Sequence, residues 1–323
     1  MFEMEIGAPL KEARLSQVKE FLACRGLTME DEPGYTVVLK DSSGCIAATG
    51  SLCGAVVKYV AVADEALGEG ACARVLSELV SHAYRNGNTH LFLFTKPENE
   101  RMFTSLGFYE MATTKDALMM ENKKNGLSRF LNELDHGKLT NTGAVVVNCN
   151  PLTNGHMYLI ETALSLCSEL HVFVVSEDRS EFPSDVRYDL VKRGTEHLKN
   201  LYVHQGGRYI VSSATFPAYF LKDKNRTEDI KADLDITLFG MRVAPALTIK
   251  TRFVGTEPYC TVTNAYNMRM KALLPAWGVH VLEIERKDGI SASEVRRLMH
   301  AGKLDEIKPL VPPVTYDYIV SHT

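Results

Sequence analysis

The chain has 323 residues, of which 45% are hydrophobic and 24% are charged, with a net charge of −4, and this length and composition predict two globular domains. The nearly balanced charge excludes the basic surplus that nucleic-acid-binding proteins usually carry, so no nucleic-acid partner is expected. Because no apolar run is long enough to cross a membrane and the N-terminus lacks a basic start followed by a long apolar core, we expect no membrane association and no secretory signal, and therefore a cytoplasmic protein.

Strands and helices alternate in the first part of the chain. The apolar patterns predict strands at 35–40, 45–51, 56–62 and 90–94, and helices at 71–85 and 99–106. The turn-rich tetrad 41–44 joins the first two strands, and Gly107 suits the end of the second helix. These elements predict an α+β domain covering residues 1–120.

A polar segment at 121–142 separates the two halves. It is rich in charges and glycines, yet it also carries an apolar series at helical spacing: Leu127, Phe130, Leu131 and Leu134. We interpret it as a short connecting helix with a polar exit, so the second domain covers residues 143–323.

The alternation is more regular in the second domain. Strands are predicted at 144–149, 170–176, 209–211, 251–254 and 280–284, and helices at 156–170, 184–198, 264–274, 291–300 and 304–310. The run 144–149 is apolar and β-branched, as in a strand buried on both faces. Strand–helix alternation of this kind predicts a parallel, doubly wound α/β sheet.

The seven cysteines do not predict a disulfide framework, because they are odd in number, widely spaced and without a C-x-x-C pair. We expect most of them to be small buried hydrophobic residues. Cys149 lies inside a candidate phosphate loop; a reactive thiol is the alternative there, and packing is the favoured interpretation.

The strand at 144–149 leads directly into Asn150-Pro151-Leu152-Thr153-Asn154-Gly155-His156, where a helix begins. This arrangement points backbone N–H groups and the positive end of a helix dipole at the carboxyl edge of the sheet, where phosphates bind. Gly155 permits a close approach to the backbone, and His156 and Thr153 offer side-chain donors. A surface histidine at a helix start is the alternative interpretation.

A second loop, Ile290-Ser291-Ala292-Ser293-Glu294-Val295-Arg296, follows the strand at 280–284 and opens another helix. Ser291 and Ser293 offer hydroxyls, and Arg296 offers charge-assisted hydrogen bonds to phosphate. The same letters also fit a plain capping box from Ser291 to Glu294. Neither loop is specific alone.

Taken together, the two loops resemble the nucleotidylyltransferase superfamily, which carries a T/H-x-G-H loop and a late I-S-x-T/S-x-x-R loop. The resemblance implies a Rossmann-like domain that binds ATP with Mg²⁺. It implies that His156 stabilises the phosphoryl charge in the transition state, with Thr153 in the slot where many members have His. It further implies that Ser291, Ser293 and Arg296 hold the β- and γ-phosphates, so that catalysis is positioning plus charge stabilisation.

Four further segments narrow the resemblance to the citrate lyase ligase family: 148–151 (NCNP), 182–188 (FPSDVRY), 253–259 (FVGTEPY) and 263–267 (TNAYN). The residues assigned to ATP binding are Asn148, Asn150, Pro151, Gly155, Gly255, Glu257, Ser291 and Ser293. Arg187, on a predicted helix, is a candidate for a phosphate or carboxylate contact, with a solvated helix charge as the alternative. A turn-only role is the alternative for Glu257.

The N-terminal half carries a weaker signal. Gly68 and Gly70 lie between a strand and a helix, and a segment from Asn99 to Phe108 ends in Gly-Phe. The pair is similar to the GNAT acetyltransferase fold, although Glu65 stands where that family commonly has Gln or Arg. The resemblance implies that Gly68, Gly70 and Asn99 contact CoA or a pantetheine arm, either for catalysis or only for docking.

The resemblance implies an acid–thiol ligase. Such an enzyme activates acetate as acetyl-adenylate, releases pyrophosphate, and acetylates the thiol of the CoA-like prosthetic group on the acyl carrier subunit of the citrate lyase complex. Three alternatives stay open: an adenylyltransferase acting on a phosphorylated small molecule, a GNAT-type acetyl-CoA-dependent acetyltransferase, and a non-catalytic nucleotide sensor.

Overall fold

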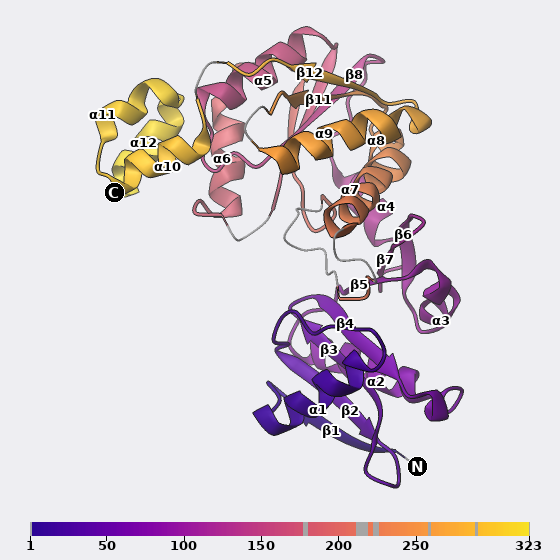
Figure 1. Cartoon of the computed structure of the whole chain (residues 1–323). Coiled ribbons are helices and arrows are strands. Elements are labelled where there is room, and N and C mark those ends of the chain that lie inside the picture. The colour runs from indigo at the N-terminus through magenta and orange to yellow at the C-terminus, as the bar shows by residue number, and fades with distance from the viewer. Residues whose placement is uncertain are drawn as a thin grey trace. The chain divides into compact units, whose positions relative to one another are not determined.

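The computed structural model describes residues 2–176, 180–210, 219–221, 226–257, 260–287 and 290–322. It divides into two compact units (Figure 1). The first consists of Met1–Gly126 and Phe216–Leu234, and the second of Leu127–Thr215 and Asp235–Thr323. The first break falls inside the segment 121–142 that the sequence predicts as a connector. The segment 216–234, which we call the returning segment, joins the first unit from a distant part of the chain.

The first unit is built on a seven-stranded sheet with the order β1-β2-β3-β4-β5-β7-β6. Its strands are β1 (Glu3–Gly7), β2 (Tyr35–Lys40), β3 (Ile46–Cys53), β4 (Val56–Val62), β5 (Phe92–Thr95), β6 (Tyr109–Thr113) and β7 (Leu118–Glu121), and its helices are α1 (Glu12–Ala23), α2 (Ala71–Arg85) and α3 (Glu100–Ser105). All neighbouring strands pair antiparallel except β4 and β5, which pair parallel. This confirms the predicted α+β class.

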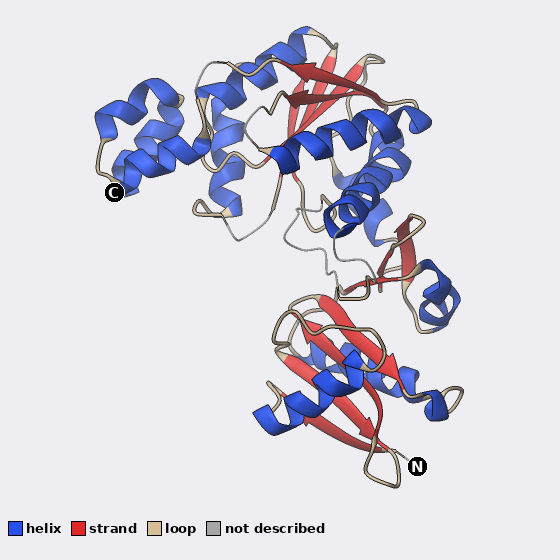
Figure 2. Ribbon diagram, viewed as in Figure 1, coloured by secondary structure: helices blue, strands red, loops and turns tan. Residues whose placement is uncertain are grey.

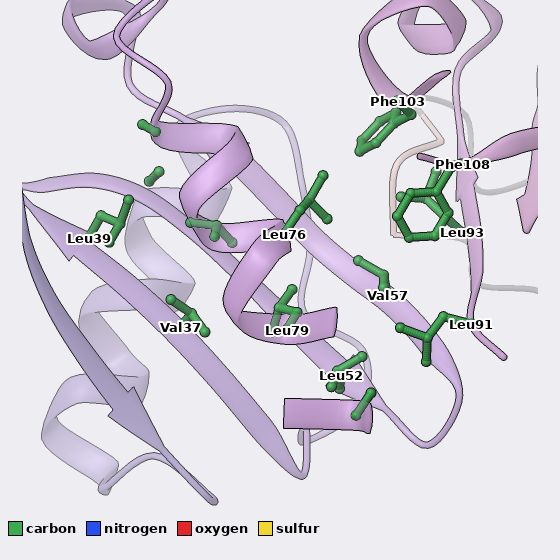
Figure 3. Packing of buried hydrophobic residues seen from close by; sticks show 14 of the residues in the cluster. Val37, Leu39, Leu52, Val57, Leu76, Leu79, Leu91, Leu93, Phe103 and Phe108 are labelled. Carbon is green, nitrogen blue, oxygen red and sulfur yellow. The ribbon is translucent and has the colours of Figure 1, made fainter. Parts of the chain in front are cut away.

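The apolar face of α2 closes the core of this unit (Figure 3). Leu76 and Leu79 of α2 pack in one buried cluster with Val37 and Leu52 of the sheet. Gly50 on β3 lies directly beneath the helix, since a Cβ there would come within 2.6 Å of Val75. Burial of this stripe stabilises the helix on the sheet, as the spacing of its apolar residues predicts.

The returning segment enters this unit beside β4 and β5. These strands pair only at Val56–Val57 with Phe92–Leu93. Tyr219, buried at 6% exposure, donates its hydroxyl to the carbonyl of Phe94 at 3.3 Å. Its ring meets that of Tyr59 edge-on, with the centroids 4.8 Å apart.

The second unit is a five-stranded sheet with the order β10-β9-β8-β11-β12, in which all strands are parallel. The strands are β8 (Thr142–Val147), β9 (Glu169–Val174), β10 (Leu201–Gln205), β11 (Ile249–Gly255) and β12 (His280–Ile284). Its α-helices are α4 (Gly126–Glu133), α5 (Asn154–Ser165), α6 (Ser184–Gly194), α8 (Ala244–Ala246), α9 (Thr261–Leu273), α10 (Ala292–His300), α11 (Leu304–Ile307) and α12 (Pro313–His322), and a π-helix spans Phe239–Val243. Helix α7 (Thr227–Leu238) begins in the first unit and ends in the second, with the division at 234–235. The order reverses at β8, so β8 and β11 flank the switch point of a doubly wound sheet, as predicted.

Helices pack around the strands of this sheet (Figure 2), and the side chains on its two faces differ in chemistry. Val145, Val172 and Phe253 face a core cluster that includes residues of α5, α6, α10 and α12. The alternating positions point the other way, and they include the buried polar residues His171 and Arg252.

One predicted element is wrong in its position. The sequence predicts a short strand at 209–211, but the strand is β10 at Leu201–Gln205. Tyr209 lies in a turn after it and packs against Phe130 of α4, with 4.9 Å between ring centroids. Val211 lies outside the described residues.

All seven cysteines are free, as expected, but their burial differs from the prediction. Cys149 alone is fully buried, whereas Cys24, Cys45 and Cys260 are exposed. In the described part of the chain, no helix combines the length and apolar character needed to cross a bilayer.

Candidate active site

The loop after β8 is held from below by Arg187. The side chain of Arg187 is 0% exposed; it donates to the carbonyl and the side-chain oxygen of Asn148 at 2.9 and 2.7 Å, to Val175 at 2.6 Å and to Phe182 at 3.0 Å, the latter two being main-chain carbonyls. Arg187 is therefore not a solvated helix charge, and its contact with a phosphate or carboxylate stays a prediction. Arg187 fastens the ends of β8 and β9 to the start of α6.

The next residues give the loop its shape. Cys149 has a φ of 50°, and the Asn150–Pro151 bond is cis. The side chain of Asn150 accepts the main-chain N–H of Phe182 at 3.0 Å. Burial raises the pKa of the Cys149 thiol well above its ordinary value. The thiol therefore stays protonated, which favours packing over reactivity.

Thr153 and His156 form a closed network at the start of α5. The Thr153 hydroxyl accepts from the main-chain N–H of His156 at 3.3 Å, and its oxygen lies 2.9 Å from His156 Nδ1. Nδ1 also accepts the main-chain N–H of Thr153 at 3.1 Å. Because Nδ1 acts as an acceptor, this network assigns the ring proton to Nε2. Thr153 thus orients His156, and its own hydroxyl, at 1% exposure, is fully used.

His156 is neutral at physiological pH. Burial, with the nearby charge of Arg286 as the second cause, lowers the pKa of His156 to about 4. A neutral imidazole with a proton on Nε2 can still donate one hydrogen bond to a ligand. Its chemistry is therefore that of a donor.

The second predicted loop opens α10. Ser291 caps this helix by accepting the main-chain N–H of Glu294 at 3.1 Å. The Glu294 carboxylate binds Arg297 at 2.6 and 2.8 Å, and Ser293 accepts from Arg296 at 3.3 Å. Ser291 therefore caps the helix as expected, and its hydroxyl proton remains available for donation.

The fold brings the two loops together. A Cβ on Gly155 would lie 3.3 Å from the carbonyl oxygen of Ile290, so the start of α5 packs closely against the residue before Ser291, the N-cap of α10. Arg296 donates to the carbonyl of Asn150 across the same junction. The α5 and α10 N-termini, with their partial positive charge, thus flank one place at the carboxyl edge of the sheet.

Arg286, a cation that lies outside both motifs, connects the end of β11 with this junction, because it pairs with Glu257 and its charge acts on His156. Glu257 pairs with Arg286, with 2.8 Å between Oε1 and Nη1. Lys287, the next residue, has its Nζ 5.7 Å above the ring of Tyr158 on α5. The adjacent basic pair before the second loop was the signal available in the sequence.

Gly255 and the N-terminal candidates also have defined places. No atom of the described residues lies within 4 Å of a Cβ built on Gly255, whose carbonyl accepts from Asn267 at 3.0 Å. Pro258 and Tyr259 of the same turn lie outside the described residues. Gly68 and Gly70 have φ of 82° and 75°, and Gly70 precedes α2. Asn99 donates to Thr95 of β5 at 2.8 Å.

The family model described as the citrate lyase ligase C-terminal domain matches residues 142–319. The chain is 37% identical to the [citrate [pro-3S]-lyase] ligase of Escherichia coli over 99% of its own length and 95% of the relative's. The chain belongs to the citrate lyase ligase family. The citrate lyase ligase of Klebsiella pneumoniae is 38% identical over 95% of this chain and 93% of that one.

More distant likenesses cover parts of the chain. A phosphopantetheine adenylyltransferase from Finegoldia magna is 34% identical over 58 residues, which are 17% of this chain and 36% of that protein. Among solved structures, Escherichia coli ElaA covers 38% of this chain and 100% of its own at 13% identity, with a TM-score of 0.34. Thermotoga maritima TmcAL bound with α-thio ATP covers 56% of this chain and 55% of its own at 14% identity, with a TM-score of 0.37.

Proposed function

We propose that this chain uses ATP to attach acetate to the thiol of the CoA-like prosthetic group on the acyl carrier subunit of citrate lyase. Two observations support the proposal: membership of a family named for ligation to citrate lyase, and the junction of two helix N-termini beside a neutral histidine donor. The junction is the observation that carries the ATP half. It concentrates positive potential at one point of the sheet edge, where phosphates bind.

In the first step, a carboxylate oxygen of acetate attacks the α-phosphorus of ATP. The bond to the β-phosphate oxygen breaks, and pyrophosphate leaves with the electron pair. Arg296 and the N–H groups at the start of α10 suit the negative charge that grows on the leaving group. The Nε2–H of His156 suits the charge on the phosphoryl oxygens.

In the second step, the carrier thiol attacks the acetyl carbon. The new C–S bond replaces the C–O bond to AMP, and the thiol proton is lost to solvent. The adenylate makes this step feasible because AMP is a far better leaving group than the oxygen of a free carboxylate.

Magnesium is expected with the triphosphate. In the described parts of the chain, no group of three or more His, Cys, Asp or Glu side chains could hold a metal ion. We therefore assign no protein ligand to the ion. Mg²⁺ commonly binds through substrate phosphates and water, and it would neutralise their charge.

Exchange of radioactive pyrophosphate into ATP tests the first step alone. We expect exchange that requires acetate and needs no carrier. Exchange that ignores acetate and instead requires a phosphorylated acceptor would establish an adenylyltransferase, whereas acetyl transfer from acetyl-CoA without ATP would establish the GNAT-type alternative.

Replacement of the histidine tests the site. His156→Ala should reduce exchange by about 100- to 1,000-fold, the usual loss when one oxyanion donor is removed. His156→Gln offers an amide N–H in a similar place and is expected to retain more activity than alanine. Wild-type exchange in His156→Ala would return this residue to a structural role.

A further inference from the structure

Arg252 is a buried cation with unused hydrogen-bond donors. It lies within β11 at 5% exposure, and among the residues that the structure describes none forms a hydrogen bond with its Nε or Nη1 atom. Burying a charged group without replacing its bonds to water is strongly unfavourable. Such a group in a folded protein calls for a specific explanation, and a bound ion or ligand is one.

An aromatic ring covers the flat face of the Arg252 guanidinium, whereas two of the nitrogens at its edge form no hydrogen bond with the described residues. The ring of Phe239 stacks on the guanidinium, with 4.6 Å from Cζ to the ring centroid. Phe239 begins the π-helix Phe239–Val243, a rare element that is frequently found at functional sites. Stacking satisfies the flat face of a guanidinium, whereas its N–H groups point outward in the plane of the group and need acceptors.

The carboxylate of Asp235, whose charge acts on Arg252, does not hydrogen-bond to these two nitrogens. Asp235 of α7 accepts a hydrogen bond from the hydroxyl of Tyr266 on α9, and neither unused nitrogen of Arg252 bonds to it. Burial raises the pKa of Tyr266 well above its ordinary value, so that hydroxyl remains a donor to Asp235. Tyr266 belongs to the segment 263–267, which the site at the loops does not use.

We propose that Arg252 is an internal binding site for a substrate oxyanion, with the carboxylate of the acid as its occupant. Because the charge of Asp235 already acts on the guanidinium, a carboxylate with one negative charge meets less repulsion there than a phosphate monoester, which carries nearly two. Two links connect Arg252 to the candidate active site. Strand β11 continues from Arg252 to Gly255 at the carboxyl edge of the sheet, and Asn267 of α9, the neighbour of Tyr266, donates a hydrogen bond to the carbonyl of Gly255. The choice of the acid as occupant rests on the proposed function.

The test compares binding with turnover in the full chain. Ligand-observed NMR measures binding of acetate and of inorganic phosphate to wild type, Arg252→Met and Arg252→Lys, with chloride as the ionic control. Arg193→Met, on the exposed face of α6, serves as the matched control. Loss of charge-assisted hydrogen bonds should raise the KM for acetate in Arg252→Met by about 10- to 100-fold, with the KM for ATP changed by less than about twofold.

Stability separates this role from a structural one. Methionine at an unpartnered buried cation should leave the melting temperature unchanged or raise it. Loss of phosphate binding alone would support the oxyanion site with phosphate as its source. Wild-type binding of both anions by a folded Arg252→Met, or by Arg252→Lys if the methionine variant unfolds, would overturn the proposal. If Arg252 binds acetate but wild type shows no acetate-dependent exchange, the site stands and the proposed ligase function fails.

Discussion

At the scale of single residues, the hydroxyl of Thr153 has three tasks within one turn of helix. It caps α5 by accepting the main-chain N–H of His156, and it bonds to Nδ1 of the same residue, so the three tasks of cap, acceptor and ring anchor rest on two hydrogen bonds. A histidine in that position could not cap the helix in the same way, because hydroxyls and short polar side chains are the preferred N-caps. Thr153 therefore acts through His156, and it is a positioning residue in the proposed reaction.

Substitutions at Thr153 separate the effect of its hydroxyl hydrogen bonds from the effect of its side-chain size. Thr153→Val keeps the shape and removes both bonds, so we expect a loss of about 1 kcal/mol of stability and a fall in exchange rate of about 10- to 100-fold as His156 loses its orientation. Thr153→Ser keeps the hydroxyl and should retain both properties. Equal activity of the valine and serine variants would show that the ring is oriented by other contacts.

Arg286 provides a second prediction at this scale. Its charge contributes to the low pKa of His156, so Arg286→Gln should raise that pKa, observable by NMR titration of the ring against the His156→Ala spectrum. Loss of a cation near the phosphates should also raise the KM for ATP by about tenfold. Lys271→Gln removes a cation paired with Glu283 on the same unit and should change neither. An unchanged pKa of His156 in the Arg286→Gln variant would show that the charge of Arg286 does not affect the His156 ring.

The residues found from sequence are those with a local pattern. Thr153, Gly155 and His156 lie within four consecutive residues, so a local pattern makes them candidates for a helix start that binds anions, and the second loop adds the specificity. The use of Arg187 could not be predicted, because its partners Asn148 and Val175 come from two other strands. Arg252 was missed because its burial also depends on distant parts of the chain. A charged residue within a strand is expected to be exposed unless the helices that cover it are known.

At the scale of elements, strong apolar patterns located most of the strands, whereas the weak pattern of β10 was missed. β4 and α2 were predicted with the bounds that the structure has. β10 (Leu201–Gln205) is an edge strand with partly exposed residues, so its apolar pattern is diluted. The apolar residues at 209–210 instead fill space beside α4, which no local rule could show.

The central histidines of β9 and β10 form a pH-sensitive pair between two elements. His171 Nδ1 lies 2.8 Å from His204 Nε2, and burial, aided by neighbouring histidines, lowers their pKa values to about 4 and about 3. The unfolded chain takes up protons near pH 6.5 that the folded pair refuses. Stability present above about pH 6.5 should therefore fall as the pH drops toward 4.

Urea unfolding at pH 7 and pH 5 measures this effect. Replacement of both histidines by glutamine should flatten the dependence on pH, whatever its effect at pH 7. His280→Gln, an exposed histidine on β12, should leave the slope unchanged. A slope that persists in the double variant would assign the effect to other groups.

At the scale of the whole molecule, the chain passes between the units at 126–127, 215–216 and 234–235. The returning segment places Tyr219 beside β4 and β5 of the first unit. Tyr219→Ala in the full chain should cost about 3–5 kcal/mol of local stability, as large aromatic truncations do. Hydrogen exchange of β4 and β5 amides would detect it, and Tyr219→Phe, which loses only the hydroxyl bond, should cost about 1 kcal/mol. Unchanged exchange in the alanine variant would show that the returning segment does not stabilise these strands.

The returning segment also bears on how such a protein could be assembled from modules. The citrate lyase ligase domain matched at 142–319 contains residues 216–234, so a gene break at the domain border would transfer part of one folded unit with the other. Recombination at a single junction would replace the N-terminal part of the first unit but keep Tyr219, which would then lose its partners Tyr59 and Phe94. Two loci, not one, would have to change together, which ties the inheritance of the first unit to that of the second.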